Sequence, residues 1–263
     1  MRGWAKEYNY NYKIMWIRKL PDNYKKEESG LYKLNFLWNH NNIYVMDNHL
    51  AAAYCWVQKC NGNRMYNFLH IDQHNDLLCN APICEYAEIL KEKTCSIDNY
   101  CSKMYKNNLP LMRWDNYIKP TQILHPDWFK INVFSTHSNY EDTIIQDIEP
   151  PMKITRIEPS KLPRELDLIF KNYKEKWIVT LDLDFFFDEN ANILFDDEYL
   201  IDFANKLRQY MDKIQVLTIS LSPECCGNGT QEGWKNSIRV LDVFMQTFGI
   251  LQTEYVHFPI GYN

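Results

Sequence analysis

Three residues with metal-ligating side chains, Asp72, His74 and Asp76, stand at alternate positions directly after an apolar, strand-forming run that begins at Phe68. If the strand continued through them, all three would share one face of a sheet. If it ended at Asp72, they would fan around the carboxyl edge of the sheet, where α/β folds place their ligands. In either case the side chains converge. Carboxylate oxygens combined with an imidazole suit Mn²⁺, Fe²⁺ or Zn²⁺ better than Ca²⁺.

A second apolar run, residues 177–187, contains two carboxylates, Asp182 and Asp184. A continuous run of this kind is typical of a parallel strand that is buried on both faces. Burying two like charges there costs many kcal/mol unless cations neutralise them. With Asp72 and Asp76 the carboxylates number four, which is too many for one divalent ion and suits two.

Composition narrows the class of protein. The 263 residues fit one large α/β domain or two small ones, and the 46% hydrophobic content can fill a sizeable core. A net charge of −5 leaves no footprint for a polyanion, so we expect no nucleic-acid partner. Glycine is scarce, with 8 residues, and no G-x-G-x-x-G or Walker loop occurs, which argues against a nucleotide cofactor.

The sequence also bears on location. No apolar run is long enough to cross a bilayer, and the first residues contain no signal-peptide core. We therefore expect a cytoplasmic protein without a membrane partner. Its eight cysteines show no zinc-finger spacing and are expected to be reduced thiols.

Expected strands alternate with expected helices along most of the chain. The strands are expected at 13–17, 31–38, 42–49, 66–72, 130–137, 154–159, 177–187 and 215–221, and the helices at 51–57, 81–93, 163–173, 196–213 and 232–248. This order is typical of an α/β protein with three layers (α/β/α) and a mainly parallel sheet. The candidate ligands all fall at the carboxyl end of an expected strand.

We expect residues 1–263 to form a single catalytic domain. Residues 1–40 suggest two strands around a polar turn at 21–30, as a peripheral N-terminal addition to the main sheet. Residues 95–126 have no clear periodicity and are expected to be irregular. Because loops of that length are usually functional, we interpret the segment as a lid or substrate wall. The alternative is a small helical insertion that does not contact substrate.

Histidines also stand where expected strands end. His49 lies at the junction between a strand and the helix that follows it. Asp47 or Asn48 could cap that helix and leave His49 incidental. Beside the carboxylate motifs, however, His49 is a good candidate for a further metal ligand. His137 ends the strand expected at 130–137.

These motifs resemble those of a known family. The pattern from Asp72 through His74 to Asp76 resembles the D-x-H-x-D motif of ureohydrolases such as arginase and agmatinase, and residues 181–185 resemble their D-x-D motif. His49 matches their first histidine ligand, although the family's Gly-Gly-Asp-His is here Met-Asp-Asn-His.

Over roughly residues 42–250, the sequence that surrounds the motifs is similar to that of one arginase-like branch. The similar stretches are Phe-Leu-His-Ile-Asp-x-His-x-Asp-Leu, Leu-Asp-Leu-Asp-Phe-Phe and Ser-Pro-Glu-x-Cys-Gly. The characterised bacterial members of that branch are peptide arginases, which convert arginine side chains of ribosomally made precursor peptides to ornithine.

The resemblance implies an arginase-like fold and two Mn²⁺ ions per chain. Carried over by position, the family pattern implies the following ligands: Asp72 and Asp182 bridging both ions, His49 and Asp76 completing one site, and His74 and Asp184 completing the other. Two divalent cations would balance the four aspartates, and the pair would lower the pKa of a water held between them.

The resemblance also implies catalytic roles. Asp76 would orient the attacking water and pass its proton to the departing amine. Glu224 would pair with the substrate guanidinium, for which a planar carboxylate is suited, unless it is only a surface acid in a turn. His137 would be the proton shuttle, with a structural histidine as the alternative. His125 is a further candidate for that role.

The predicted function is a binuclear manganese hydrolase that converts arginine residues of a precursor peptide to ornithine and releases urea. A second possibility is a small-molecule ureohydrolase acting on free arginine, agmatine or another guanidino compound. A third is a metal-dependent amide hydrolase with one Zn²⁺, and a fourth is a peptide-binding module without catalysis.

Overall fold

The computed structural model describes residues 14–20, 32–91, 93–137, 152–227 and 230–255. An eight-stranded sheet forms its centre. The strands are β1 (Ile14–Arg18), β2 (Leu37–His40), β3 (Ile43–Met46), β4 (Asn67–Asp72), β7 (Asn132–Thr136), β8 (Ile154–Arg156), β9 (Trp177–Asp182) and β10 (Ile214–Ser220), in the spatial order β1-β2-β3-β10-β9-β4-β7-β8. The strands from β3 to β8 in this order pair in parallel, and β1 and β2 extend the β3 edge in antiparallel fashion.

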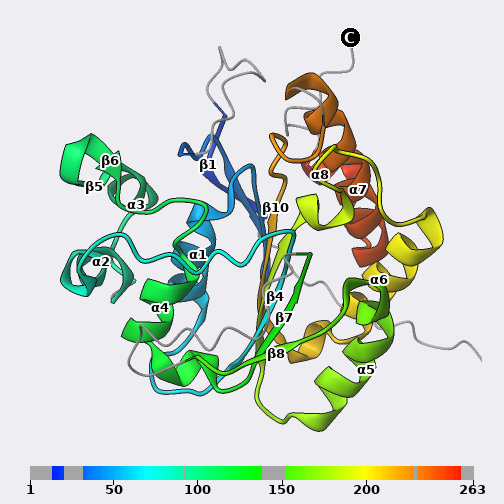
Figure 1. Ribbon diagram of the computed structural model, residues 1–263, viewed down its shortest axis with the longest axis horizontal. Coiled ribbons are helices and arrows are strands. Elements are labelled where there is room, and N and C mark those ends of the chain that lie inside the picture. Colours follow the sequence, from blue (N-terminus) through cyan, green and yellow to red (C-terminus); the bar gives the residue numbers. More distant parts are fainter. Residues whose placement is uncertain (1–13, 21–31, 92, 138–151, 228–229, 256–263) are drawn as a thin grey trace, which may run out of the picture.

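Helices cover both faces of the sheet. They are α1 (Ala52–Lys59), α2 (Ile83–Leu90), α3 (Ile97–Ser102), α4 (Ile118–Leu124), α5 (Leu162–Asn172), α6 (Asp197–Gln209), α7 (Thr230–Phe248) and α8 (Gln252–Tyr255). The helices α1 to α4 lie on one side of the sheet and α5 to α7 on the other (Figure 1). The expected three-layer α/β class with a mainly parallel sheet is therefore confirmed.

Burial on both sides explains the apolar run in β9. All six residues of the strand are buried. Val179 and Leu181 belong to the apolar cluster formed with α5, α6 and α7, whereas Ile178 belongs to the cluster formed with α1 and α4. Because alternate side chains point to opposite faces, a central strand in this fold carries apolar side chains on both faces.

Several expected strands are longer than the structure shows, and for two of them the hydrogen bonds explain why. The strand at 177–187 ends at Asp182, because the Asp182 side chain accepts a hydrogen bond from the Asp184 amide at 3.2 Å and starts the 3₁₀ turn η6 (Leu183–Phe186). The strand expected at 31–38 begins only at Leu37. The amides of Asn35 and Phe36 donate to the buried Asp47 carboxylate at 3.0 and 3.1 Å, so they are not available for a strand pairing.

The segment 95–126 is not irregular, so that expectation was wrong. It contains α3, a short hairpin of β5 (Met104–Tyr105) and β6 (Leu109–Pro110), and α4. Ser96 caps α3 by accepting a hydrogen bond from the Asn99 amide at 3.2 Å. Pro120 lies in the first turn of α4, where an amide hydrogen has no partner within the helix. Whether the segment is a lid or substrate wall, or an insertion that does not contact substrate, stays a prediction.

The remaining expectations differ in outcome. The helices expected at 81–93 and 196–213 are shorter in the structure, as α2 and as α6 followed by the 3₁₀ turn η7 (Met211–Lys213). The polar turn expected at 21–30 lies outside the described residues. That the whole chain is one catalytic domain stays a prediction. Within the described part of the chain, no helix combines the length and apolarity that a membrane span needs.

Candidate metal centre

The central strand β4 ends at Asp72, so the ligand-type residues after it fan out from the strand tip. The His74 amide donates a hydrogen bond to Asp72 Oδ1 at 2.6 Å, which turns the chain back over the end of the strand. Asp76 has a left-handed backbone with φ of +51°. That conformation costs free energy for any residue other than glycine, so it persists where surrounding contacts hold it. The loop from Asp72 to Asp76 is therefore held in a defined conformation at the edge of the sheet.

His49 reaches the same cluster of side chains from the end of β3, which β10 and β9 separate from β4 in the sheet. Asn48 caps the 3₁₀ turn η2 (His49–Ala51) by accepting a hydrogen bond from the Leu50 amide at 3.0 Å. The cap does not make His49 incidental. Its Nε2 lies 3.3 Å from an oxygen of Asp76, and its Nδ1 contacts an oxygen of Asp182.

The end of β9 supplies two carboxylates. The amide of Gln73 donates to Asp184 Oδ1 at 3.2 Å, and His74 Nδ1 lies 3.2 Å from the other oxygen of Asp184. The hydroxyl of Ser222, which follows β10, donates to Asp182 Oδ2 at 2.6 Å. Hydrogen bonds from neighbouring strand ends thus orient both carboxylates.

Together these contacts bring all six predicted ligand residues into one cluster. Three overlapping groups have ligand atoms within 4.8 Å of one another: His49 with Asp72 and Asp182, His70 with Asp72 and Asp76, and Asp72 with His74 and Asp184. Asp72 belongs to all three groups, which is the position expected of a bridging ligand. The His74 side chain is 50% exposed, whereas the other five are buried, so the cluster opens to solvent on the His74 side. The individual ligand roles stay predictions.

The carboxylates repel one another in the absence of cations. Burial raises the pKa of Asp184 to about 7, and the charges of Asp182 and Asp72 contribute to the rise. Burial and the charge of Asp72 also raise the pKa of Asp76 well above its usual value. Burial acts in the same sense on Asp72, but the nearby histidines outweigh it and lower its pKa to about 2.

The charges of these carboxylates raise the pKa values of both histidines in the cluster. Burial alone would lower the pKa of His49, but Asp182 and Asp76 outweigh it and raise the pKa to about 10. Contacts with Asp184 and Asp72 raise the pKa of His74 to about 11. In the metal-free protein, protons on the two imidazoles therefore do part of what cations would do.

The donor set fits divalent metal ions. Both ring nitrogens of His49 and one oxygen each of Asp72 and Asp76 are buried without a hydrogen bond of normal geometry, although the two nitrogens lie against oxygens of Asp182 and Asp76. Buried polar atoms usually have hydrogen-bond partners of good geometry, so a group of such atoms facing one another fits a metal ion as their common partner. Carboxylates and imidazoles are the ligands preferred by Mn²⁺, Fe²⁺ and Zn²⁺.

The raised pKa values predict that metal affinity rises with pH. At pH 7 the folded, metal-free protein holds protons on His49 and His74 and partly on Asp184, because their pKa values lie at about 10, 11 and 7. Each proton has to leave before its group can bind a metal. Titration calorimetry with Mn²⁺ in buffers of different ionisation enthalpy should show proton release at pH 7. Metal affinity that is constant between pH 6 and pH 9 would contradict this account.

The sequence analysis did not assign a role to His70. It is fully buried and lies two residues before Asp72 on the same face of β4. Its Nε2 lies 3.0 Å from the backbone carbonyl of His74. Since a carbonyl only accepts, Nε2 carries the hydrogen, and burial lowers the pKa of this imidazole. The signal in the sequence was a histidine at an inward position of an otherwise apolar strand.

We expect His70→Phe to loosen the loop between Asp72 and Asp76. Phenylalanine keeps the packing against Phe68 and Phe134 but leaves the His74 carbonyl unsatisfied, which costs about 1–3 kcal/mol. Loss of such an outer partner should weaken metal binding roughly tenfold. Metal titration of the variant measures this. His70→Gln, which retains a donor, should recover part of the affinity, and wild-type affinity in His70→Phe would refute the role.

The three other predicted residues lie in different places. Glu224 is half-buried in the turn after β10, close to Ser222. His137 follows β7 at the same sheet edge, and its Nε2 donates to the Phe185 carbonyl at 2.7 Å. His125 bonds the Leu90 carbonyl at 2.7 Å and belongs to the connection that meets the start of β4, so it lies at the opposite edge. Their catalytic roles stay predictions.

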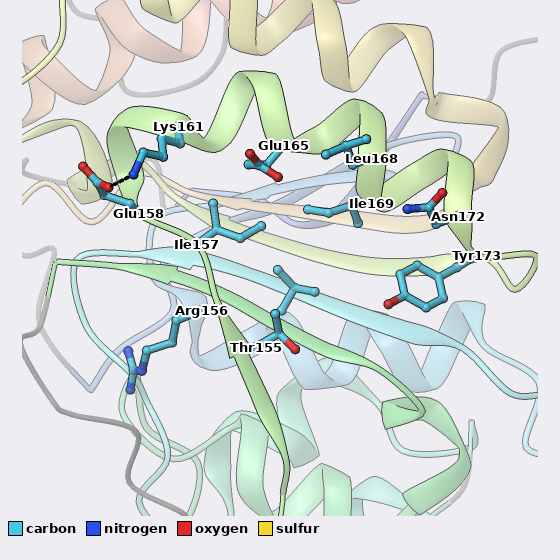
Figure 2. Close-up of a pocket in the computed structure, with 11 residues that line it drawn as sticks. Thr155, Arg156, Ile157, Glu158, Lys161, Glu165, Leu168, Ile169, Asn172 and Tyr173 are labelled. Atoms are coloured by element: carbon cyan, nitrogen blue, oxygen red, sulfur yellow. Dashed lines mark hydrogen bonds and ion pairs between the residues drawn. The ribbon is translucent and has the colours of Figure 1, made fainter.

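A separate cavity of about 490 Å³ lies between β8 and α5 (Figure 2). Its lining includes Thr155, Glu158 and Glu165, and none of the six candidate ligands contributes to it. Arg156, which also lines the cavity, donates to Thr136 Oγ1 at 3.1 Å, and Thr136 donates to Asn75 Oδ1 in the ligand loop at 3.2 Å. The candidate centre is therefore not this cavity.

Comparison with known proteins finds no matching family model and no matching curated protein. Among solved structures, the chain is similar to arginase from Helicobacter pylori, with 12% identity, a TM-score of 0.43, and coverage of 78% of this chain and 71% of that one. It is similar to Entamoeba histolytica arginase in complex with L-ornithine, with 13% identity, a TM-score of 0.43, and coverage of 77% and 68%. The chain is also similar to proclavaminate amidino hydrolase from Streptomyces clavuligerus, with 10% identity, a TM-score of 0.44, and coverage of 79% of this chain and 63% of that one. All three TM-scores lie below 0.5, so these likenesses are weak.

Proposed function

We propose that this protein is a manganese-dependent hydrolase with two metal ions, which converts arginine side chains of a peptide to ornithine and releases urea. The observation that carries the proposal is the cluster of four aspartates and two histidines at the tips of three strands, with Asp72 shared by all three groups of possible ligands. Four carboxylates balance two divalent cations in charge. A site of this charge can accept a cationic guanidinium without strong repulsion.

When bound, the two ions would supply a water activated for attack at neutral pH. The chain's own residues have to hold the guanidinium and handle protons. Asp76 is suited to proton transfer because it is buried and one of its oxygens lies 3.3 Å from His49 Nε2. Proton transfer by a positioned carboxylate is a common part of such hydrolases.

Glu224 is proposed to orient the substrate. It stands after β10, in the same turn as Ser222, which bonds Asp182. A carboxylate can accept two parallel hydrogen bonds from a planar guanidinium, which fixes the reacting carbon relative to the metal ligands. The exposed side of His74 provides the direction from which a long arginine side chain can enter.

A peptide substrate is favoured by the surface beside the ligand loop. Leu78, two residues after Asp76, is 52% exposed, and its amide donates to the Asp115 carbonyl at 3.0 Å. The neighbouring Trp114 packs edge-to-face against Tyr32, which is 46% exposed. Apolar and aromatic side chains of this kind can bind the backbone and flanking residues of a peptide.

The experiment is incubation of the Mn²⁺-loaded protein with an arginine-containing precursor peptide, with free arginine and agmatine in parallel. The proposal predicts urea, and a loss of one cyanamide unit per modified arginine in the peptide mass. Urea from free arginine or agmatine alone would identify a small-molecule ureohydrolase. Release of a carboxylic acid from an amide substrate, with one metal per chain, would identify the amide hydrolase instead.

A further inference from the structure

Tyr117 lies against the metal centre although it belongs to the segment 95–126, in which the sequence analysis named no metal ligand. Its side chain is fully buried. The ring centroid lies 5.1 Å from that of His49, at an interplanar angle of 31°, and 5.5 Å from that of Trp56. His49 is therefore held between the carboxylates on one side and an aromatic ring on the other.

The turn that carries Tyr117 is fixed to the ligand loop. The Leu78 amide, just after that loop, donates to the Asp115 carbonyl at 3.0 Å. The side chain of the buried Asn116 donates to the Leu111 carbonyl at 2.9 Å and to the Tyr86 hydroxyl at 3.2 Å. These bonds leave little freedom for the backbone at the start of α4, so the position of the Tyr117 ring is set by the fold.

The hydroxyl of Tyr117 is buried without a hydrogen bond of normal geometry to any described residue. Such a group costs about 1–3 kcal/mol if it stays unsatisfied. Burial and the charges of Asp76 and Asp72 raise the phenol's pKa, while the neighbouring Thr180 hydroxyl acts in the opposite sense, so the group keeps its proton and can donate. The Asp76 oxygen that lies 3.3 Å from His49 Nε2 is likewise buried without a hydrogen bond of normal geometry.

We propose that Tyr117 is a positioning residue of the metal centre, whose ring keeps the His49 imidazole in place and whose hydroxyl donates a hydrogen bond to the Asp76 carboxylate in the metal-loaded protein. The proposal rests on the metal centre of the proposed function. It assigns a purpose to part of the 95–126 segment, which supplies a residue that orients two predicted ligands. Outer partners that hold metal ligands affect metal affinity as well as turnover.

The test uses Tyr117→Phe, which keeps the ring and removes only the hydroxyl. We expect the metal-free variant to melt close to the wild-type temperature, because the Tyr117 hydroxyl makes no hydrogen bond of normal geometry to a described residue. We expect Mn²⁺ affinity to fall about tenfold, with two ions still bound at saturation. Calorimetric titration of the purified protein gives both quantities without an activity assay. Tyr210→Phe is the matched control, since its hydroxyl donates to Asp167 at 2.6 Å on the other side of the sheet. That variant should lose thermal stability and keep its metal affinity.

A double-mutant cycle identifies the partner. If the hydroxyl acts through Asp76, then Tyr117→Phe should cause no further loss of metal affinity in an Asp76→Asn background. Wild-type metal affinity in Tyr117→Phe, or additive losses in the double variant, would overturn the assignment and leave the proposed function intact. A wild-type protein that binds no divalent ion would overturn the metal centre, and the role of Tyr117 with it.

Discussion

Asp182→Ala is expected to abolish turnover and to leave the protein with at most one bound metal ion. Asp182, the last residue of β9, contacts His49 and accepts a hydrogen bond from the Ser222 hydroxyl. It therefore links the tip of β9 to the residues that follow β3 and β10. Metal ions contribute several kcal/mol of transition-state stabilisation, and a loss of about 4 kcal/mol corresponds to a rate roughly 10³-fold lower.

The variant should remain folded, because it removes one buried carboxylate from a cluster in which like charges repel. Metal analysis by plasma mass spectrometry and urea release by the peptide assay are the two measurements. Asp197→Asn is the matched control: its carboxylate pairs with Arg239 on the surface, where such ion pairs contribute little. Unchanged metal content and unchanged turnover in Asp182→Ala would contradict the role of Asp182 as a metal ligand.

Metal removal is expected to lower the melting temperature substantially. Four carboxylates in one cluster destabilise the metal-free fold, and binding at a thousandfold excess over Kd stabilises by about 4 kcal/mol per site. For a chain of this size that corresponds to roughly 8–16 °C.

Differential scanning calorimetry before and after chelation, and again after addition of Mn²⁺, checks this expectation. The effect should be reversible and should depend on metal concentration. The Asp182→Ala protein serves as the internal control, because its melting temperature should respond much less to the chelator. A wild-type melting temperature that ignores both chelator and Mn²⁺ would mean that the cluster binds no metal.

The strand ends were the part of the site that the sequence could predict. Apolar runs closed by carboxylates mark where β4 and β9 end, and parallel strands bring those ends to one edge. The exact end of β9 could not be predicted, since the apolar run continues to Phe187 while the chain already leaves the sheet at Asp182. There the local hydrogen bond between Asp182 and the Asp184 amide overrides the apolar pattern.

The position of His49 relative to the carboxylates depends on strand order, which the sequence does not contain. β10 lies between β3 and β9, so His49 has to reach past the end of β10 to contact Asp182. The reach is possible because His49 lies in the 3₁₀ turn after β3, and because β10 ends in the small residue Ser220. Motif spacing alone gives no such information.

His70 and Tyr117 show a second limit. Each acts on the centre through groups that only the fold brings near: a backbone carbonyl four residues along for His70, and an imidazole 68 positions away in the chain for Tyr117. Tyr117 lies in a segment whose lack of periodicity suggested an irregular loop, although cap and proline positions produce α3 and α4. Residues that position ligands carry no motif of their own.

The central claim is that six side chains from three strand tips bind two divalent ions. Anomalous scattering from crystals grown with Mn²⁺ tests it most directly. The account predicts two manganese peaks about 3.5–4 Å apart, with Asp72 bonded to both. No peak at the cluster, or a single ion that leaves His74 and Asp184 without a metal, would contradict it.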